Sequence, residues 1–214
     1  AEGRIQSHES KRGRALFLRR ELRCMTDYFA VLEQPRAPWL DPVLLKEAYH
    51  RKTLQTHPDI VAPERDDDFA ELNEAYQVLQ DPKRRLHHLL ALENCAPSSA
   101  DQAIPGELQD LFLLIGAANQ RANLLLEKIR STPNALSRAL LKPQIIEVQS
   151  EVRALRGQVR DLDSVAVERL RQINSAWTND RACHVPELSN LYSRFAYLSR
   201  WSAQLDEIAF QLAN

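Results

Sequence analysis

Residues 42–59 read PVLLKEAYHRKTLQTHPD, and this stretch decides the fold of the N-terminal half of the chain. It follows Asp41, so that an N-cap residue and a proline at the first helical position mark the start of a helix. The helix must end before Pro58, because proline disfavours the α conformation in the residue that precedes it. The stretch therefore predicts a helix that runs into a loop, and this loop carries the tripeptide His57-Pro58-Asp59.

A second helix is predicted after this loop. Three aspartates at positions 66–68 place negative charge where the dipole of a starting helix favours it. Apolar residues then recur at spacings of three and four, which indicates one buried stripe. The members of the stripe are Phe69, Leu72, Ala75, Tyr76 and Leu79. Asp81-Pro82 ends or kinks the helix, and a short helix is expected over residues 28–32.

The C-terminal half repeats apolar residues in an i, i+3, i+7 rhythm over about 105–130, 143–177 and 188–212. Such stripes allow three long helices to bury their seams against one another in an antiparallel bundle. We expect the second stretch to pause near Asp163 and to resume after it. Residues 134–141 predict a short extra helix.

Glycine is scarce, with 5 among 214 residues, and β-branched runs are short, which favours helices over strands. We therefore expect an all-α chain with an N-terminal helical hairpin followed by a C-terminal antiparallel three-helix bundle. A polar, proline-containing stretch separates the two parts. The predicted segments are a basic N-terminal extension (1–25), the hairpin region (26–93), a linker (94–104) and the bundle (105–214).

The composition argues against several classes of function. A formal net charge of −1 lacks the basic footprint of a nucleic-acid-binding protein. The three cysteines form no C-x-x-C pair, and His87 and His88 point about 100° apart on a helix, so no metal site is indicated. The longest apolar run, Leu111–Ile115, is far shorter than the roughly 20 residues of a membrane span. We expect no nucleic-acid partner, no membrane association, no metal and no cofactor.

Residues 1–24 carry seven basic and three acidic residues, a net charge of +4. This head is either an organelle transit peptide or sequence upstream of a true start at Met25, and its acidic residues favour the second interpretation. The protein is then expected in the cytoplasm, or in the mitochondrial matrix if the head is a transit peptide. Binding of nucleic acid by the head is a further hypothesis, and it predicts a steep dependence on salt.

The tripeptide stands in a wider pattern. Tyr28-Phe29 precedes it, KEAYHR at 46–51 leads into it, and FAELNEAYQVLQDP at 69–82 follows it. This order resembles the J domain, the module of DnaJ-type co-chaperones, over about residues 26–92. The resemblance implies a helical hairpin whose loop presents the tripeptide to a DnaK-type chaperone of the heat-shock 70 family.

By this resemblance, the tripeptide His57-Pro58-Asp59 would trigger ATP hydrolysis in the chaperone, and the chain would be an activator and not an enzyme. The residues expected to supply electrostatic contacts are Lys46, Arg51 and Lys52. Lys52 stands where the family usually has leucine, so it is also expected along the edge of the core. The alternative is that the tripeptide is an ordinary loop and the cations are a solvated face.

The rest of the chain is similar to the HscB family of co-chaperones, which serve iron–sulfur cluster assembly. It lacks a glycine/phenylalanine-rich segment and C-x-x-C-x-G-x-G repeats, and RFAYLSRWSAQLDEI at 194–208 resembles the last helix of that family's bundle. The resemblance implies that the bundle binds an iron–sulfur scaffold protein. The residues expected to bind this client are Glu107, Asp110, Leu111, Leu114 and Phe195.

Five consecutive apolar residues at 111–115 are more than one helix face buries. Leu113 and Leu114 are therefore expected to stay partly exposed as a partner surface, although a pure bundle core is the equal alternative. Two further alternatives concern the whole chain. It could serve a client unrelated to iron–sulfur clusters, or act as a structural helical adaptor that activates no chaperone.

Overall fold

The computed structural model describes residues 26–56, 66–95, 104–177 and 181–213. The regular elements of these residues are all helical, which confirms the all-α prediction. In chain order they are α2 (Tyr28–Val31), α3 (Pro42–Thr56), α4 (Asp66–Gln80), α5 (Pro82–Leu92), the 3₁₀-helix η3 (Gly106–Leu108), α6 (Gln109–Ser131), α7 (Ala135–Ala139), α8 (Lys142–Ala176) and α9 (Arg181–Ala213).

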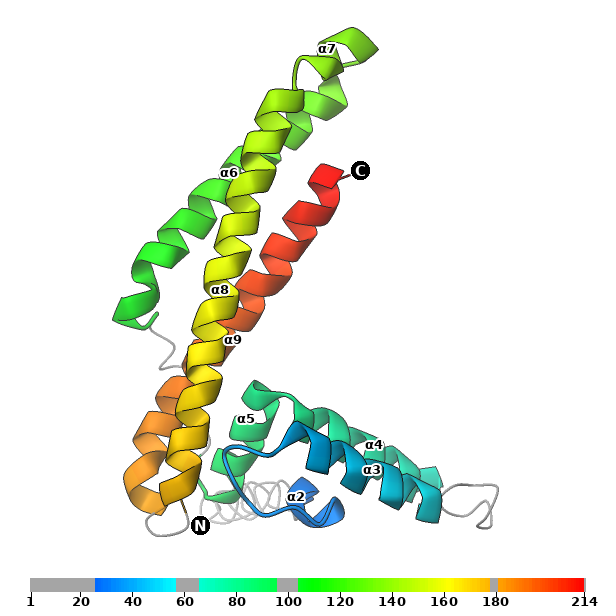
Figure 1. Ribbon diagram of the computed structural model, residues 1–214, viewed down its shortest axis with the longest axis vertical. Helices are drawn as coiled ribbons and strands as arrows, with labels where there is room; N and C mark the ends of the chain where they lie inside the picture. The colour runs from blue at the N-terminus through cyan, green and yellow to red at the C-terminus, as the bar shows by residue number, and fades with distance from the viewer. Residues whose placement is uncertain (1–25, 57–65, 96–103, 178–180, 214) are drawn as a thin grey trace, which may run out of the picture.

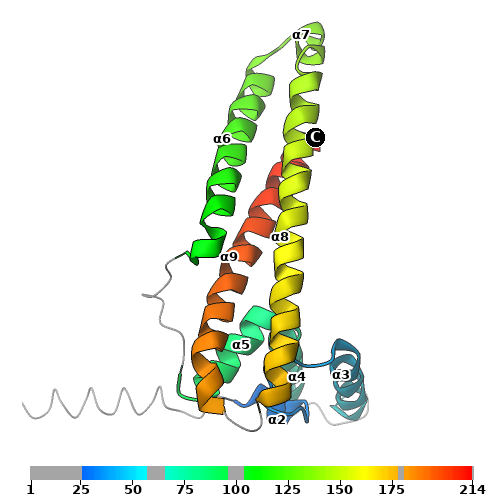
Figure 2. The ribbon, with the colours of Figure 1, turned by 60° about the vertical axis from the view of Figure 1, so that its left-hand side comes forward.

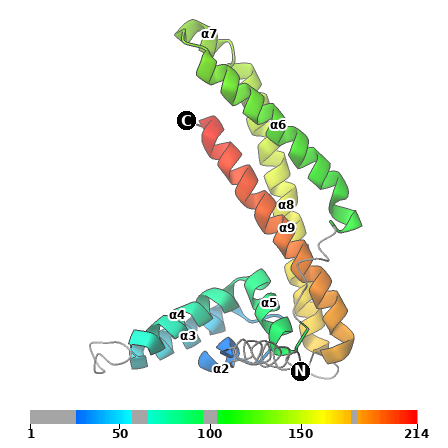
Figure 3. The ribbon, with the colours of Figure 1, turned by 180° about the vertical axis from the view of Figure 1, so that it is seen from behind.

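Helices α6, α8 and α9 form a long bundle, and the hairpin region (26–93) forms a shorter arm at the lower end, or foot, of this bundle (Figure 1). Helices α6, α8 and α9 run side by side along the long axis of the molecule (Figure 1), and the view turned by 60° shows the same three helices together (Figure 2). Helices α3 and α4 lie side by side and project sideways from the lower end of α8 and α9, as the view from behind also shows (Figure 3). The predicted hairpin and three-helix bundle are thus both present.

Aspartates start the helices of the hairpin region, as the sequence predicts. An Oδ1 atom of Asp41 accepts a hydrogen bond from the Val43 amide at 2.8 Å, and that of Asp81 accepts one from the Arg84 amide at 2.7 Å. Because Pro82 follows Asp81, helix α4 ends at Gln80 and α5 begins as a separate helix.

A first hydrophobic core joins the hairpin region to the foot of the bundle. It packs α2, α3, α4 and α5 against the lower ends of α8 and α9. Its fully buried members, each less than 2% exposed, include Phe29, Leu32, Leu79, Leu86, Leu89, Leu90, Leu170, Trp177 and Leu188. The residues on either side of the predicted linker therefore share one core.

A second core fills the upper part of the bundle, between α6 and the upper ends of α8 and α9. Its members include Leu108, Ile115, Ala118, Ala122, Val152, Leu155, Val159, Leu198, Trp201, Leu205 and Ile208. Helix α8, with 35 residues, is about 50 Å long and takes part in both cores. The expected pause near Asp163 is wrong, because α8 continues through this residue and buries Ala166 and Leu170 in the first core.

The segment between α2 and α3 is tied to the end of α8. The Trp177 indole Nε1 donates a hydrogen bond to the carbonyl oxygen of Arg36 at 2.9 Å, and the Trp39 amide donates to Asn174 Oδ1 at 3.3 Å. The guanidinium of Arg171 lies over the Trp39 ring, 5.0 Å from its centroid. These contacts fix the arm in its position relative to the bundle.

Two polar side chains of α5 are buried in the hairpin region. Arg85 donates from Nε to the carbonyl oxygen of Pro38 at 3.0 Å and from Nη1 to that of Leu79 at 2.6 Å. His88 Nε2 accepts a hydrogen bond from the Tyr28 amide at 3.1 Å, and burial lowers the pKa of this imidazole. Each therefore satisfies backbone groups that the fold removes from water.

No helix among the described residues has both the length and the apolar composition that a membrane span requires. The same residues contain no group of three or more histidine, cysteine, aspartate or glutamate side chains arranged to hold a metal ion.

Candidate functional site

The α3–α4 hairpin is held rigid by contacts along its inner face. Leu45 and Ala48 of α3 are each only 2% exposed. The Tyr49 hydroxyl donates a hydrogen bond to Asn73 Oδ1 at 2.6 Å, and the rings of Tyr49 and Tyr76 stack with their centroids 4.3 Å apart. The face of α3 that carries Leu45, Ala48 and Tyr49 is thus the face that packs on α4.

The tripeptide His57-Pro58-Asp59 lies outside the described residues. What the structure describes are its two flanking helices. Helix α3 ends at Thr56 and α4 begins at Asp66, and both of these ends lie at the side of the arm farthest from α8 and α9 (Figure 1).

The three predicted docking cations of α3 differ in their surroundings. Lys46 is exposed. Lys52 donates to Glu33 Oε1 at 2.5 Å, and Arg51 Nη2 lies 3.6 Å from Glu33 Oε2. The Lys52 side chain is 26% exposed and lies along the edge of the core. This position is the one expected for it as an alternative to a contact with the chaperone.

Glu33 is a residue that the sequence reasoning missed. It occupies the left-handed region with φ 53° just after α2, and this turn directs its carboxylate to α3. The hydrogen bond from Lys52, and then the charges of Lys52 and Arg51, lower the pKa of Glu33. Two of the three predicted partner cations therefore already contact a carboxylate of their own chain.

The outer face of α3 carries apolar residues that the sequence reasoning also missed. Val43, Leu44 and Leu54 are 64%, 59% and 70% exposed. The signal that could have found them is the pattern of α3 itself, which has apolar residues on both its inner and its outer face instead of one stripe.

The predicted client surface lies at the start of α6. Glu107 and Asp110 are exposed, and Glu107 Oε1 accepts a hydrogen bond from Arg194 Nη1 at 2.8 Å. Leu113 and Leu114 are 66% and 50% exposed, as expected from the run of five apolar residues. Phe112 is also exposed beside them, at 46%.

Two of the predicted client-binding residues are buried. Leu111 belongs to the second core and Phe195 to the first, with 6% and 3% of their surfaces exposed. Phe195 continues the α9 stripe that contains Leu188 and Leu191, so its ring packs inward against the hairpin region. Leu111 supports the α6 surface from beneath, whereas Phe195 packs in the other core, and neither side chain offers area to a partner in this conformation.

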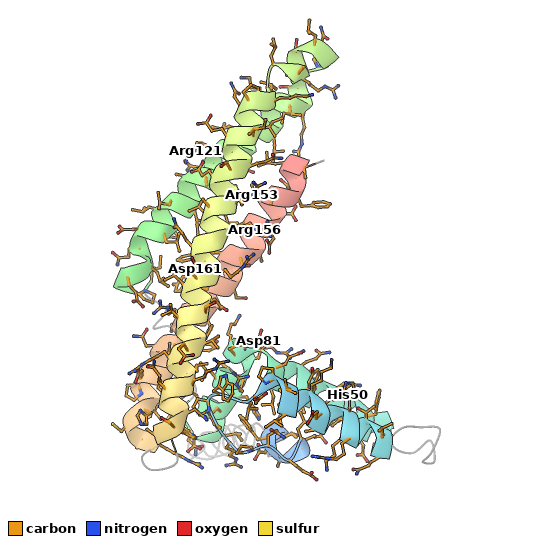
Figure 4. All side chains as sticks on the ribbon, in the orientation of Figure 1. His50, Asp81, Arg121, Arg153, Arg156 and Asp161 are labelled. Atoms are coloured by element: carbon orange, nitrogen blue, oxygen red, sulfur yellow. The ribbon has the colours of Figure 1, made fainter. Side chains whose placement is uncertain are left out.

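A cavity of about 500 Å³ lies where the start of α5 meets α8 and α9. Asp81 and Arg156, both labelled in Figure 4, line it together with Asp163, whose carboxyl pKa is raised by burial and by the nearby Asp81 charge. Arg156 pairs with Asp206 at 2.5 Å across the same cavity. Charges of both signs face one another here, so the lining has no net preference for an anion or a cation.

Known proteins match the arm in sequence. The DnaJ domain family model matches residues 27–88. The chaperone protein DnaJ 2 of Thermus thermophilus is 45% identical over 60 residues, which are 28% of this chain and 21% of that protein. The chaperone protein DnaJ 1 of Cutibacterium acnes is 37% identical over 59 residues, 28% of this chain and 14% of that protein. The chain thus spans about a fifth or less of these relatives.

Two solved structures match most of the chain in fold. The chaperone HscB from Vibrio cholerae superimposes with a TM-score of 0.54 and 19% identity, covering 87% of this chain and 99% of that one. The human co-chaperone protein HscB superimposes with a TM-score of 0.50 and 16% identity, covering 86% and 82%. Residues 27–88 are therefore a DnaJ domain, or J domain, within a chain whose fold is similar to that of HscB co-chaperones.

Proposed function

We propose that this chain is a co-chaperone that stimulates the ATPase of a DnaK-type chaperone through His57-Pro58-Asp59 and delivers a client, an iron–sulfur scaffold protein. The observation that carries the first half is the J domain itself, with its rigid α3–α4 hairpin and the intact tripeptide between the two helices. The catalytic residues belong to the chaperone, and this chain acts as an activator.

The tripeptide suits such a role chemically. The ring of Pro58 fixes its own φ angle, so the loop loses less conformational entropy when the chaperone binds. His57 and Asp59 are compact hydrogen-bonding groups on either side of this stiff position. A partner that binds the loop therefore meets polar groups in a restricted range of positions.

Replacing His57 by glutamine is expected to abolish the stimulation, because the imidazole is lost from the tripeptide while the flanking helices are unchanged. The measurement is a single-turnover ATPase assay of a purified DnaK-type chaperone with the full chain. His87→Gln is the matched control, since His87 is an exposed histidine on α5, outside the α3–α4 hairpin, and its replacement should leave the stimulation unchanged. Equal stimulation by the His57 variant and the unaltered chain would favour a structural adaptor instead.

The second half of the proposal places the client on the exposed start of α6. Phe112, Leu113 and Leu114 form an apolar patch, and Glu107 and Asp110 lie beside it. An apolar centre with charged neighbours is typical of a protein-binding surface. The similarity of the fold to HscB co-chaperones supports an iron–sulfur scaffold protein as the client.

Leu114→Asp is expected to weaken binding of a purified iron–sulfur scaffold protein at least about tenfold, because a charge enters the centre of an apolar contact. Isothermal titration calorimetry with the full chain measures this. Leu124→Asp is the control, since Leu124 is 68% exposed farther along the same helix. Unchanged ATPase stimulation by both variants would show that the hairpin is intact, and equal scaffold affinities of both variants would contradict this surface.

A further inference from the structure

The end of the bundle farthest from the arm is built from the last turn of α6, the short helix α7 and the first turn of α8. We call residues 127–144, which span these three parts, the bundle tip. The tip and the arm lie at opposite ends of the molecule in all three ribbon views (Figure 1, Figure 2 and Figure 3). The start of α6, where the client is proposed to bind, is about 33 Å away, because α6 has 23 residues.

Two leucines of the bundle tip are unusually exposed. Leu136 and Leu140 are 72% and 73% exposed, the highest values among the large apolar side chains that the structure describes. They lie four positions apart, in and just after α7, so they share one face about 6 Å apart along the helix axis. Leu141 is only 6% exposed and attaches the same segment to the bundle.

Hydrogen bonds fix the segment that carries these leucines. The Leu136 amide donates to Asn134 Oδ1 at 2.9 Å, which caps α7. The guanidinium of Arg138 donates from Nε to the carbonyl oxygen of Thr132 at 3.0 Å and from Nη2 to that of Pro133 at 3.3 Å. The outward position of the two leucines is therefore part of the folded structure of the tip.

The bundle tip is also basic. Its four cations are all exposed, and its one acidic residue is Glu127. The cations are Lys128, Arg130, Arg138 and Lys142. The tip thus has a net charge of +3, whereas the rest of residues 25–214 has 17 basic and 25 acidic residues, a net charge of −8. Within the described part of the chain, none of the four cations pairs with a carboxylate.

The helix dipoles account for only part of this charge. Lys128 and Arg130 lie in the last turn of α6, where the dipole of the helix favours cations. Lys142 is the first residue of α8, where the dipole disfavours a cation. The exposed leucines contribute nothing to the two cores either. The tip therefore combines positive charge and apolar area that the stability of the fold does not explain.

We propose that the bundle tip binds the surface of a membrane that contains anionic phospholipids. Leu136 and Leu140 enter the apolar layer, and the four cations contact the lipid phosphates. The net charge of the tip is opposite to that of such a surface, whereas the rest of residues 25–214 would be repelled by it. This inference goes beyond the proposed function and does not depend on it.

The size and shape of the tip favour a lipid surface over a protein partner. Two leucines one turn apart cover far less than the roughly 800 Å² per partner of a standard protein interface. The tip is moreover the narrow, projecting end of the bundle (Figure 1), so a protein would need a matching hollow to enclose it. A fluid lipid surface needs neither a hollow nor a large preformed area, because lipids rearrange around the inserted side chains.

Surface attachment differs from a membrane span. The absence of a long apolar run argues against a span, and no described helix provides one. Contact with a lipid surface needs only a few apolar residues beside cations. The proposal therefore revises the expectation of no membrane association, which rested on the length of the apolar runs.

Co-sedimentation of the full chain with lipid vesicles tests the proposal. One set of vesicles is pure phosphatidylcholine, and the other contains about 30% phosphatidylglycerol, whose headgroup is anionic. The chain should bind the anionic vesicles at least about tenfold more tightly than the neutral ones. Raising the salt from about 0.1 M to about 0.4 M should weaken this binding several-fold, because salt screens exposed charges.

Two pairs of variants test the leucines and the cations separately. Leu140→Ser should weaken binding to the anionic vesicles at least about fivefold, through the loss of inserted apolar area. Its control is Val165→Ser, since Val165 is 58% exposed on α8 about 35 Å from Lys142. Lys142→Glu should also weaken binding at least about fivefold, and its control is Arg200→Glu, an exposed cation of α9. Neither control should change the affinity by more than about twofold.

The other outcomes contradict the proposal in distinct ways. If both tip variants bind like the unaltered chain, the lipid is held elsewhere, and residues 1–24 with their net charge of +4 become the site. Equal binding to neutral and anionic vesicles contradicts the role of the cations. Absence of binding to either kind of vesicle contradicts the proposal as a whole. In that case a dimer in sedimentation velocity that Leu140→Ser abolishes would assign the tip to a second copy of this chain.

Discussion

Replacing Trp177 by alanine will lower the free energy of unfolding by about 3–5 kcal/mol. The indole is 1% exposed in the first core, between the hairpin region and the foot of the bundle. Its removal leaves a large cavity, and it also takes away the Nε1 donor that satisfies the carbonyl oxygen of Arg36. Both losses occur at the junction of the arm and the bundle, so the arm should lose its fixed position along with stability.

Urea denaturation followed by circular dichroism measures this loss, and two further variants separate its causes. Trp177→Phe keeps most of the ring and removes the N–H donor, so it should cost about 1–2 kcal/mol. Trp201→Ala removes a tryptophan of the second core that is 3% exposed, and it should destabilise by an amount similar to Trp177→Ala. A loss below about 1 kcal/mol for Trp177→Ala would mean that this indole does not hold the junction.

Arg85→Ala is expected to cost about 3 kcal/mol, through lost packing and two lost hydrogen bonds. The guanidinium satisfies the carbonyl oxygens of Pro38 and Leu79, which are otherwise left without these donors in the interior. Burial lowers the pKa of Arg85 to about 10, so the side chain is still charged at neutral pH and its removal also relieves some desolvation. The hydrogen bonds and the packing outweigh this relief in the alanine variant.

The neighbouring residue provides the control for Arg85. Arg84 is exposed and pairs with Glu74 at 2.7 Å on the surface, so Arg84→Ala should cost less than about 1 kcal/mol. Arg85→Met restores the aliphatic volume without the hydrogen-bond donors. Its free energy of unfolding, measured by urea denaturation, should therefore lie between those of Arg84→Ala and Arg85→Ala. If Arg84→Ala and Arg85→Ala were equally stable, the buried hydrogen bonds of Arg85 would contribute nothing measurable.

The helices were predictable because their signals are local. Asp41 and Asp81 cap the helices that they precede, and the Asp81-Pro82 pair separates α4 from α5 where the sequence indicates a break. The spacing of apolar residues also identified the buried stripe of α4 and the three bundle helices. Each of these features depends on residues within a few positions of one another.

What the sequence did not reveal depends on residues far apart in the chain. The apolar stripe of α9 does not say which of its residues meet the bundle and which meet the hairpin region, so Phe195 was placed on a client surface although it lies in the first core. Glu33 lies 18 and 19 positions before the two cations that it contacts, in a turn whose backbone no local rule predicts. Long-range packing decides both cases.

The candidate site was predictable to different degrees. The tripeptide and its flanking motifs led to the J domain, which the family match confirms. The roles of His57, Pro58 and Asp59 stay predictions. The exposure of Leu113 and Leu114 followed from counting apolar residues, whereas the exposure of Leu54 depends on which face of α3 packs inward, and this is a tertiary property.

The sharing of α8 and α9 between two cores limits how such a protein can be recombined. In a chimera that exchanges only residues 26–93 for another J domain, the buried residues of the new domain would pack against side chains that belong to this chain. These side chains include Leu170, Trp177 and Leu188 of the bundle. Grafts of this kind must carry a compatible lower half of the long helices with them. For the same reason, buried residues of the arm and of the foot of the bundle should covary among related sequences.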